Sequence, residues 1–253
     1  MLIRRLPILR GVSVGLVLPA YDPNVPKLRA YVDALLAELS PERVRIELDS
    51  PSGASFSFPE HPEVTVNTVG ERRGKGLAIT QGFDALDTDI LAFADADGST
   101  PADSIADVVS ALPAVDLAVG SRRHPESRIQ THQSVVRRKL GDAFAATSRF
   151  LLPVSLYDYQ CGAKAITSDA WREIREYLYE SGFSWDVELV TVAAALDYEI
   201  REVPVAWEDD PHSTVNTPAA VKELARTVLT LRGRYDRIRE GVDDDSRTRL
   251  IDR

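Results

Sequence analysis

Asp95 and Asp97 are the residues whose types and spacing point most directly to chemistry. They stand one residue apart at the end of an apolar run, in the stretch 90–101 (ILAFADADGSTP). The run predicts a buried parallel strand, which delivers both carboxylates to the sheet edge where α/β proteins bind ligands. Two carboxylates this close repel, so keeping both ionised needs a cation nearby. A divalent metal, completed by a substrate diphosphate, would supply that charge; an Asp-rich turn is the alternative.

Two predicted helix starts belong to the same edge. After the aspartates, Ser99 or Thr100 suits the N-cap, and Pro101 suits the first position of a helix over residues 102–112. Before them, the segment 74–76 (Gly-Lys-Gly) places flexible backbone and the cation of Lys75 at a helix start, which is a workable anion site. By itself that segment is a weak signal, because a glycine at a helix start often serves only a turn.

Arginines follow the predicted strands. Arg122 comes directly after a strand expected at 116–120, and Arg138 lies near the start of a helix expected at 134–152. Guanidinium groups suit phosphate oxygens, although a surface ion pair explains each arginine alone equally well. The metal pair, the Gly-Lys-Gly turn and the arginines converge on one sheet edge. This convergence indicates a site for two phosphate-like anionic centres.

Three further carboxylates stand beside aromatic residues or glycine: Asp158, Asp186 and Glu188. A carboxylate at a site edge holds sugar hydroxyls or acts as a general base, and Asp186 is the candidate base. The alternative for Asp186 is to stabilise the first turn of its own helix. The histidines show no metal-ligand spacing, and Cys161 has no histidine partner, which argues against thiol chemistry.

The elements that position these residues alternate between strand and helix. Strands are expected at 12–19, 43–48, 64–68, 90–94 and 116–120, and helices at 27–39, 77–86 and 102–112. This alternation predicts an α/β fold with a mostly parallel sheet flanked by helices. The second half is less regular, with a strand at 163–167, helices at 169–178 and 183–196, and an edge strand at 199–207 that contains Pro204.

Composition narrows the class of protein. The 253 residues carry a net charge of −9, which argues against a nucleic-acid partner. Only five of the 30 basic residues are lysines, a balance that fits a high-salt cytoplasm or a GC-rich genome. The single cysteine suits a reducing compartment, and neither a signal peptide nor a membrane-spanning run is recognisable. We therefore expect a cytoplasmic protein.

The end of the chain is predicted to be a basic amphipathic helix (216–242) and a charged, disordered tail (243–253). The helix has Val228 and Leu231 on one face and several arginines on the other. It either lies on an anionic membrane surface, as a peripheral contact at the cytoplasmic face, or packs on the core with a solvated outer face.

A set of motifs in a fixed order resembles glycosyltransferase family 2, which has the GT-A (Rossmann-like) fold. The motifs are VLPAY (17–21), RGKG (73–76), FADADG (93–98), GSR (120–122), DYQCGAK (158–164) and WDVEL (185–189). The branch that they resemble most is that of the polyprenyl-phosphate (dolichyl-phosphate) glucosyl- and mannosyltransferases. The resemblance covers about residues 12–214, and it implies a GT-A domain at 1–215, with a nucleotide-sugar half (1–120) and an acceptor half (121–215).

The resemblance also implies roles for individual residues. The nucleotide of the donor would be bordered by Pro19, Ala20, Tyr21, Asp49, Lys75, Asp95 and Ala96. Asp95 and Asp97 would bind Mg²⁺ or Mn²⁺ on the donor diphosphate, and Arg122 and Arg138 would bind the phosphate of the acceptor. The donor sugar or the acceptor would be faced by Gln160, Asp186 and Glu188.

Three segments depart from the family pattern. Asp22-Pro23 replaces the usual Asn-Glu, Asp49 lacks the usual following Asp-Gly-Ser, and the segment 211–214 replaces a Gly-Ser-Lys. These departures bear on base recognition and on closure over the acceptor.

The function expected from these features is an inverting, metal-dependent hexosyl transfer. The donor is a UDP- or GDP-linked sugar, and the acceptor is a polyprenyl (dolichyl) phosphate or a related glycan. An anionic phosphate acceptor needs no strong base, whereas an alcohol acceptor would need one. The alternatives are a nucleotidyltransferase or other nucleotide-sugar enzyme, which would release pyrophosphate, and a non-catalytic relative that retains the fold.

Overall fold

The structure is a computed structural model that describes residues 11–50, 52–53, 55–58, 60–129, 148–208, 217–242 and 248–253. Its strands are β1 Val14–Tyr21, β2 Arg43–Asp49, β3 Val64–Val69, β4 Ile90–Ala94, β5 Leu117–Ser121, β6 Arg128–Ile129, β7 Ala163–Thr167, β8 Ile200–Pro204 and β9 Ala206–Trp207. Its α-helices are α1 Val25–Leu39, α2 Lys75–Asp84, α3 Ala102–Ser110, α5 Ser168–Ile174, α6 Trp185–Ala195 and α7 Thr217–Arg239. Short 3₁₀ helices are η1 Leu112–Ala114, η2 Arg175–Tyr177 and η3 Leu250–Asp252.

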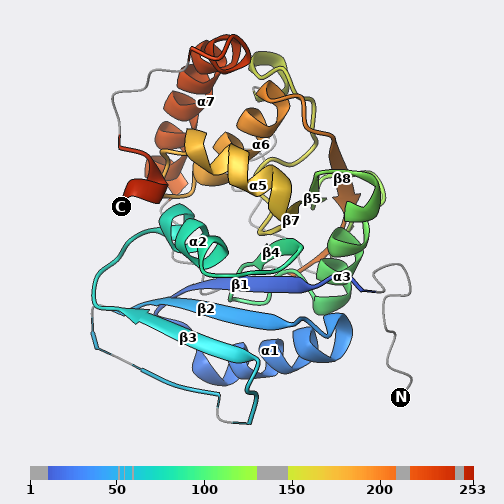
Figure 1. The fold of residues 1–253 in the computed structure, drawn as a ribbon, viewed down its shortest axis with the longest axis vertical. Coiled ribbons are helices and arrows are strands. Elements are labelled where there is room, and N and C mark those ends of the chain that lie inside the picture. The colour runs from blue at the N-terminus through green and yellow to red at the C-terminus, as the bar shows by residue number, and fades with distance from the viewer. Residues whose placement is uncertain are drawn as a thin grey trace.

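The main sheet has seven strands in the order β3-β2-β1-β4-β7-β5-β8 (Figure 1). All neighbouring strands run parallel except β7, which is antiparallel to both β4 and β5. The predicted mostly parallel sheet is therefore confirmed, and β8 is an edge strand, as Pro204 indicated. The strand order reverses direction between β1 and β4, and the carboxyl ends at such a switch point are where open α/β sheets bind ligands.

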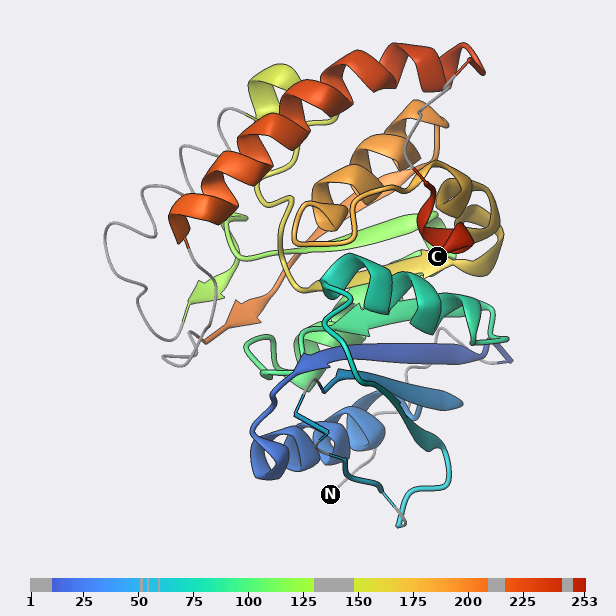
Figure 2. The same cartoon turned by 90° about the vertical axis from the view of Figure 1, so that its left-hand side faces the viewer.

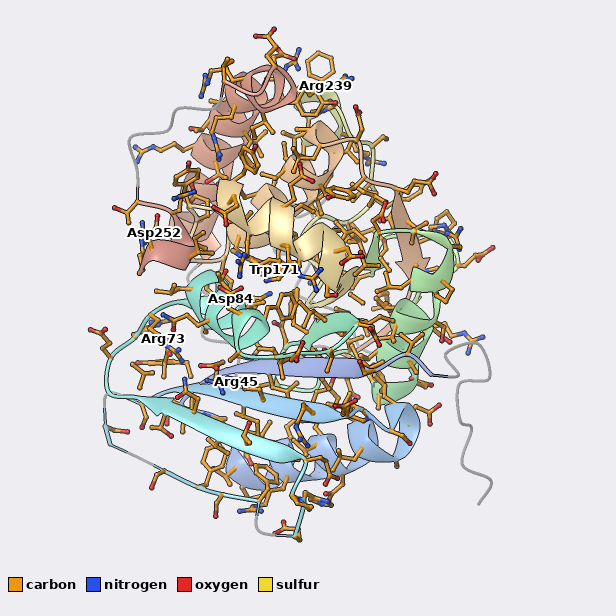
Figure 3. The ribbon with its side chains drawn as sticks, in the orientation of Figure 1. Arg45, Arg73, Asp84, Trp171, Arg239 and Asp252 are labelled. Atoms are coloured by element: carbon orange, nitrogen blue, oxygen red, sulfur yellow. The ribbon has the colours of Figure 1, made fainter. Side chains whose placement is uncertain are left out.

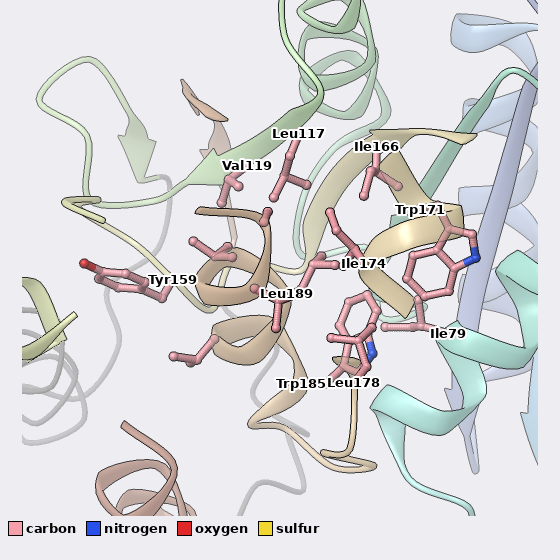
Figure 4. Close-up of a cluster of buried hydrophobic side chains, with 14 of the residues drawn as sticks. Ile79, Leu117, Val119, Tyr159, Ile166, Trp171, Ile174, Leu178, Trp185 and Leu189 are labelled. Atoms are coloured by element: carbon pink, nitrogen blue, oxygen red, sulfur yellow. The ribbon is translucent and has the colours of Figure 1, made fainter. Parts of the chain in front are cut away.

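The sheet is buried on both faces because successive side chains of its central strands alternate between two hydrophobic clusters. In β4, Phe93 belongs to the cluster beneath α2, α5 and α6, whereas Ala92 belongs to the cluster beneath α1 and α3. Figure 2 shows these layers edge-on, and Figure 4 shows Ile79, Trp171 and Trp185 converging in the first cluster. This three-layer packing explains why the strands read as nearly continuous apolar runs.

The predicted N-cap of α3 is wrong. The helix begins at Ala102, and Pro101 occupies the N-cap position with no side-chain cap. Ser99 and Thr100 are held by other partners: the amide of Ser99 donates to Asp97 Oδ1 (2.9 Å), and the carbonyl of Thr100 accepts from the hydroxyl of Tyr31 (2.6 Å). These bonds keep the two residues in the turn that follows β4.

The C-terminal helix packs on the core. In α7, Val228, Leu231 and Ile238 are buried in the first hydrophobic cluster. The predicted disordered tail needs a correction for residues 248–253, because Leu250 is only 1% exposed and its amide donates to the carbonyl of Leu178 (2.9 Å). An apolar side chain in the tail thus finds a buried position on the body. Among the described residues, no helix is long and apolar enough to cross a membrane.

Candidate functional site

Asp95 and Asp97 lie directly after β4, next to the switch point of the sheet. The amide of Asp95 donates to the carbonyl of Gly162 (3.0 Å), and a Cβ added at Gly162 would overlap with the carboxylate of Asp95. The side chain of Asp95 is 38% exposed, so the carboxylate is anchored on one side and open on the other. The Oδ1 atom of Asp97 accepts from the amide of Ser99 in the tight turn that follows.

The charge of this pair suits a divalent cation. The pKa of Asp97 is raised, mainly by burial and secondly by the negative charge of the neighbouring Asp95. A hard divalent ion prefers such oxygen ligands and would relieve the repulsion. Within the described part of the chain, no group of three or more His, Cys, Asp or Glu residues could hold a metal. Any metal at Asp95 and Asp97 therefore needs further ligands, such as phosphate oxygens or water.

Lys75 links Asp186 to this pair. The Nζ atom of Lys75 lies 3.0 Å from Asp95 Oδ1 and 2.9 Å from Asp186 Oδ2. Although burial disfavours the charged ammonium, the two carboxylates outweigh it and raise the pKa of Lys75. A second lysine, Lys164, donates to Asp186 Oδ1 (2.6 Å). Charges of alternating sign therefore run from α6 to the end of β4.

At the start of α2, several backbone donors of the predicted anion site have partners within the protein. The amides of Gly76 and Leu77 both donate to the carbonyl of Ser181, at 2.8 Å and 3.2 Å. The amide of Gly74 donates to Asp49 Oδ2 (3.2 Å). The amides of Gly74, Gly76 and Leu77 are thus satisfied by the protein, and the side-chain charge of Lys75 is the main feature that this segment offers to an anion.

The carboxylate of Asp49 is bound by neighbouring residues of the protein. It accepts from the amide of Arg73 (2.8 Å), from Arg73 Nε (2.7 Å) and from Gly74, and it is buried. The carboxylate predicted to border the nucleotide therefore braces the turn before α2. Arg73 lies between α2 and the first strands (Figure 3).

At the end of β1, an aromatic residue is exposed. Tyr21 is 43% exposed, and the guanidinium of Arg72 lies 4.2 Å from its ring centroid. Of the neighbouring residues predicted to border the nucleotide, Pro19 and Ala96 are partly exposed and Ala20 is buried. Tyr21 is therefore the aromatic surface on which a planar group can stack at this edge.

Arg122 forms a second charged centre with Asp158. Its Nε and Nη2 atoms donate to the two carboxylate oxygens at 2.6 Å and 3.0 Å, and its amide donates to Oδ2. Burial opposes ionisation of Asp158, but the Arg122 guanidinium beside it holds the pKa of that carboxyl well below its usual range. The amide of Gln160 donates to the same carboxylate (3.1 Å). Arg138, the other predicted phosphate ligand, lies outside the described residues.

Glu188 does not face a substrate. Its side chain is fully buried, pairs with Arg234 of α7 (2.7 Å) and accepts from the amides of Tyr179 and Glu180. The prediction that it contacts the donor or acceptor is therefore wrong, because its acceptor capacity is taken up by α7 and by the loop before α6.

Asp186 is a poor general base in this setting. Burial favours its neutral form, but Lys164 and Lys75 outweigh that effect and lower the pKa of Asp186. A carboxylate that is fully ion-paired on both oxygens has little tendency to accept a proton. Its position suits a structural role in the charged network rather than base catalysis.

Lys164 is the residue of this network that the sequence analysis did not single out. Its signal was a lysine in the middle of an otherwise apolar strand, Ala163–Thr167. Buried charge of this kind is almost always paired, so the strand pattern alone could have prompted a search for its partner. The identity of that partner depended on how α6 packs over β7.

Comparisons with known proteins all identify glycosyltransferases as similar to this chain. The model of Glycosyl transferase family 2 matches residues 53–166. Glycosyltransferase AglD of Haloferax volcanii is 27% identical over 87% of this chain and 37% of its own length. Human dolichyl-phosphate beta-glucosyltransferase is 28% identical over 74% of this chain and 61% of its own length.

Two further similarities agree with these. Undecaprenyl-phosphate mannosyltransferase of Micrococcus luteus is 30% identical over 62% of this chain and 68% of its own length. The solved structure of glucosyl-3-phosphoglycerate synthase from Mycobacterium tuberculosis, with Mn²⁺, UDP-glucose and phosphoglyceric acid, matches with a TM-score of 0.65 at 17% identity, covering 88% of this chain and 81% of that one. At that identity the similarity establishes the GT-A fold alone.

The chain spans from about a third to about half of the length of the first curated relatives that it matches. The family-model match, the curated relatives and the GT-A fold nevertheless agree on one family. The chain belongs to glycosyltransferase family 2.

Proposed function

We propose that this protein is a metal-dependent, inverting hexosyltransferase that moves a hexose from a UDP- or GDP-linked donor to a polyprenyl (dolichyl) phosphate. The observation that carries the proposal is the pair Asp95 and Asp97 at the carboxyl end of β4, beside the end of β1. Curated relatives named as dolichyl-phosphate glucosyltransferases support a lipid phosphate as the acceptor. A GT-A neighbour solved with Mn²⁺ and UDP-glucose supports the metal and the donor class.

In this proposal Asp95 and Asp97 hold Mg²⁺ or Mn²⁺ against the donor diphosphate. When bound there, the metal would act as a Lewis acid and stabilise the negative charge of the leaving nucleoside diphosphate. Lys75 adds a positive charge at the same place, since its ammonium already lies 3.0 Å from Asp95. Tyr21 offers its exposed ring to the nucleotide at the end of β1.

The state of Asp186 favours a phosphate acceptor over an alcohol. An alcohol nucleophile needs a base, and Asp186, the predicted base, is ion-paired on both oxygens. A phosphate monoester is already anionic, so it needs orientation rather than deprotonation. Arg122 can provide that orientation, because Asp158 fixes its guanidinium through Nε and Nη2 and leaves Nη1 for an anion, judged from the described residues.

A lipid acceptor requires contact with a membrane, and α7 supports a peripheral contact. On its outer face Leu229 is 64% exposed and stands between Arg226 and Arg232, which are both exposed. The helical residues 148–151, which include the exposed Phe150, lie beside α7 in both ribbon views (Figures 1 and 2). Exposed apolar side chains among arginines suit an anionic lipid surface.

The test is a transfer assay with labelled UDP- and GDP-hexoses and dolichyl phosphate in anionic vesicles with Mn²⁺. We expect a lipid-linked sugar product from the native protein. Asp97→Asn keeps an oxygen for the amide of Ser99 but removes the charge, so product formation should fall by about 10²-fold.

The matched control is Asp103→Asn. Asp103 lies six residues later, exposed in the first turn of α3, and this variant should retain the native rate. Undiminished transfer by Asp97→Asn would contradict the metal role. Release of pyrophosphate in place of a nucleoside diphosphate would instead identify a nucleotidyltransferase.

A further inference from the structure

Lys164 is a buried cation that the transfer chemistry above does not use. It lies in the middle of β7, opposite Phe93 of β4 and Val119 of β5. Its side chain is 1% exposed, and its Nζ atom donates to Asp186 Oδ1 (2.6 Å) and to the carbonyl of Cys161 (2.9 Å). An ammonium in such a place is costly unless it is paired. Strands β4 and β5, which flank β7, fix the backbone of Lys164, and its side chain reaches Asp186 of α6.

Asp186 stands between two lysines, one on each carboxylate oxygen. Oδ1 meets Lys164, and Oδ2 meets Lys75 at 2.9 Å. Lys75 in turn meets a second carboxylate, that of Asp95, at 3.0 Å. Both ammonium groups also lie close to the ring of Phe93, at 5.0 Å and 5.6 Å from its centroid. The order Lys164, Asp186, Lys75, Asp95 therefore alternates in charge.

We infer that Lys164 is a positioning residue, which neutralises Asp186 and so leaves Lys75 available to Asp95 and to the donor diphosphate. A buried carboxylate with one cationic partner holds that partner more tightly than a carboxylate that has two. Without Lys164, Lys75 would be the remaining cationic partner of Asp186 among the described residues, and it would be drawn away from Asp95. The statement about the donor rests on the proposed function, whereas the statement about Asp95 does not.

Lys164→Met tests this inference in the full-length protein. In a crystal structure of the unliganded variant, we expect Lys75 Nζ to keep its contact with Asp186 but to move out of ion-pair distance from Asp95. Calorimetric affinity for UDP with Mn²⁺ should fall by about tenfold. Lys164→Gln, which keeps a hydrogen-bond donor, replaces the methionine variant if that one fails to fold.

The double variant Lys164→Met/Asp186→Asn separates positioning from simple damage. With the charge of Asp186 removed, nothing competes for Lys75, so the contact with Asp95 should return and the affinity should recover to within about threefold of the native value. A purely structural role predicts that the second change adds to the first. A double variant with lower affinity than the single one would therefore overturn the inference.

Arg234→Met is the matched control. It breaks a different buried ion pair, that of Arg234 with Glu188, which lies on α6 as Asp186 does. It should lower the melting temperature and keep the contact between Lys75 and Asp95. An unchanged Lys75–Asp95 contact in Lys164→Met would also overturn the inference. If the native protein does not bind UDP with Mn²⁺, the proposed function fails, and the crystal structures still decide the role of Lys164.

Discussion

At the scale of single residues, the carboxylates of the site differ in how much positive charge meets them. Asp186 has two lysines, and Asp158 has the bidentate guanidinium of Arg122. Asp97 stands apart, because burial and the charge of Asp95 raise its pKa. The pair after β4 is therefore where additional positive charge is most stabilising, and this is the place that we assign to the metal.

Gly162 is predicted to set the position of Asp95. Gly162→Ala places a methyl group where the carboxylate of Asp95 now lies, so the carboxylate must turn away. We expect the affinity for Mn²⁺ in the presence of UDP to fall by about tenfold, measured by calorimetry.

The change should leave the far-ultraviolet circular dichroism spectrum unaltered. Gly70→Ala serves as a control for the loss of a glycine, because nothing lies within 4 Å of a Cβ at Gly70 and its φ is not positive. Native affinity in Gly162→Ala would show that the carboxylate has another position from which it can bind.

At the scale of elements, the loop before α6 caps the start of α2. The carbonyl of Ser181 accepts from Gly76 and Leu77, and Trp185 packs directly on Gly76. At the other end of α2, Asp84 accepts from the indole nitrogen of Trp171 in α5 (2.9 Å), as their neighbouring positions in Figure 3 indicate. Helix α2 is therefore held at both ends by elements of the second half, and Lys75 is positioned with it.

Two glycines in helices are predicted to respond oppositely to alanine. A Cβ at Gly76 would lie 2.5 Å from the carbonyl oxygen of Glu180 and 2.6 Å from Trp185 Cβ, so Gly76→Ala should cost about 1–3 kcal/mol of stability. Gly233 in α7 has nothing within 4 Å of the added atom. There, alanine should stabilise the protein by up to about 1 kcal/mol.

Urea unfolding of both variants measures this difference. Equal effects of the two substitutions would mean that the loop at 180–185 yields to the extra atom, and that it does not constrain α2.

At the scale of the whole molecule, buried ion pairs connect segments that lie far apart in the chain. Lys75 and Asp186 are 111 residues apart, and Arg122 and Asp158 are 36 apart. A further pair, between Glu188 and Arg234, attaches α7 to α6. Since breaking a buried pair leaves an uncompensated charge, each of these contacts fixes the relative placement of the two segments that it joins.

Acid is predicted to destabilise the fold through the buried pair of Asp158 with Arg122. Because Arg122 lowers the folded-state pKa of Asp158 below its ordinary value of 3.8, the ionised carboxylate contributes stability above pH 3.8. That contribution is lost as the pH falls through the folded pKa. Asp158→Asn should therefore be less stable at pH 7, by about 1–3 kcal/mol, and should lose less stability between about pH 6 and about pH 2.

Urea unfolding across this pH range is the measurement. Asp169→Asn is the control, because the side chain of Asp169 is 90% exposed and its pair with Arg172 lies at the surface. Parallel pH profiles for the native protein and Asp158→Asn would mean that other carboxylates account for the acid sensitivity.

The sequence by itself determined where the strands of the main sheet lie and where the two aspartates stand. The strand predicted at residues 90–94 coincides with β4, and the strand predicted at 163–167 coincides with β7. The prediction succeeds here because both strands are buried on both faces, so each stands out in the sequence as a short, mostly apolar run. The parallel sheet then follows from the alternation of strands and helices.

The tertiary structure alone decided which polar groups remain open to a ligand. A backbone amide or a carboxylate has few bonding positions, and a distant residue fills them without leaving a signal nearby. Ser181 takes the amides at the start of α2, Arg73 takes Asp49, and Arg234 takes Glu188. The local sequence indicates which hydrogen bonds and ion pairs a residue can form. The packing of distant residues decides whether those bonds are made within the protein or remain available to a ligand.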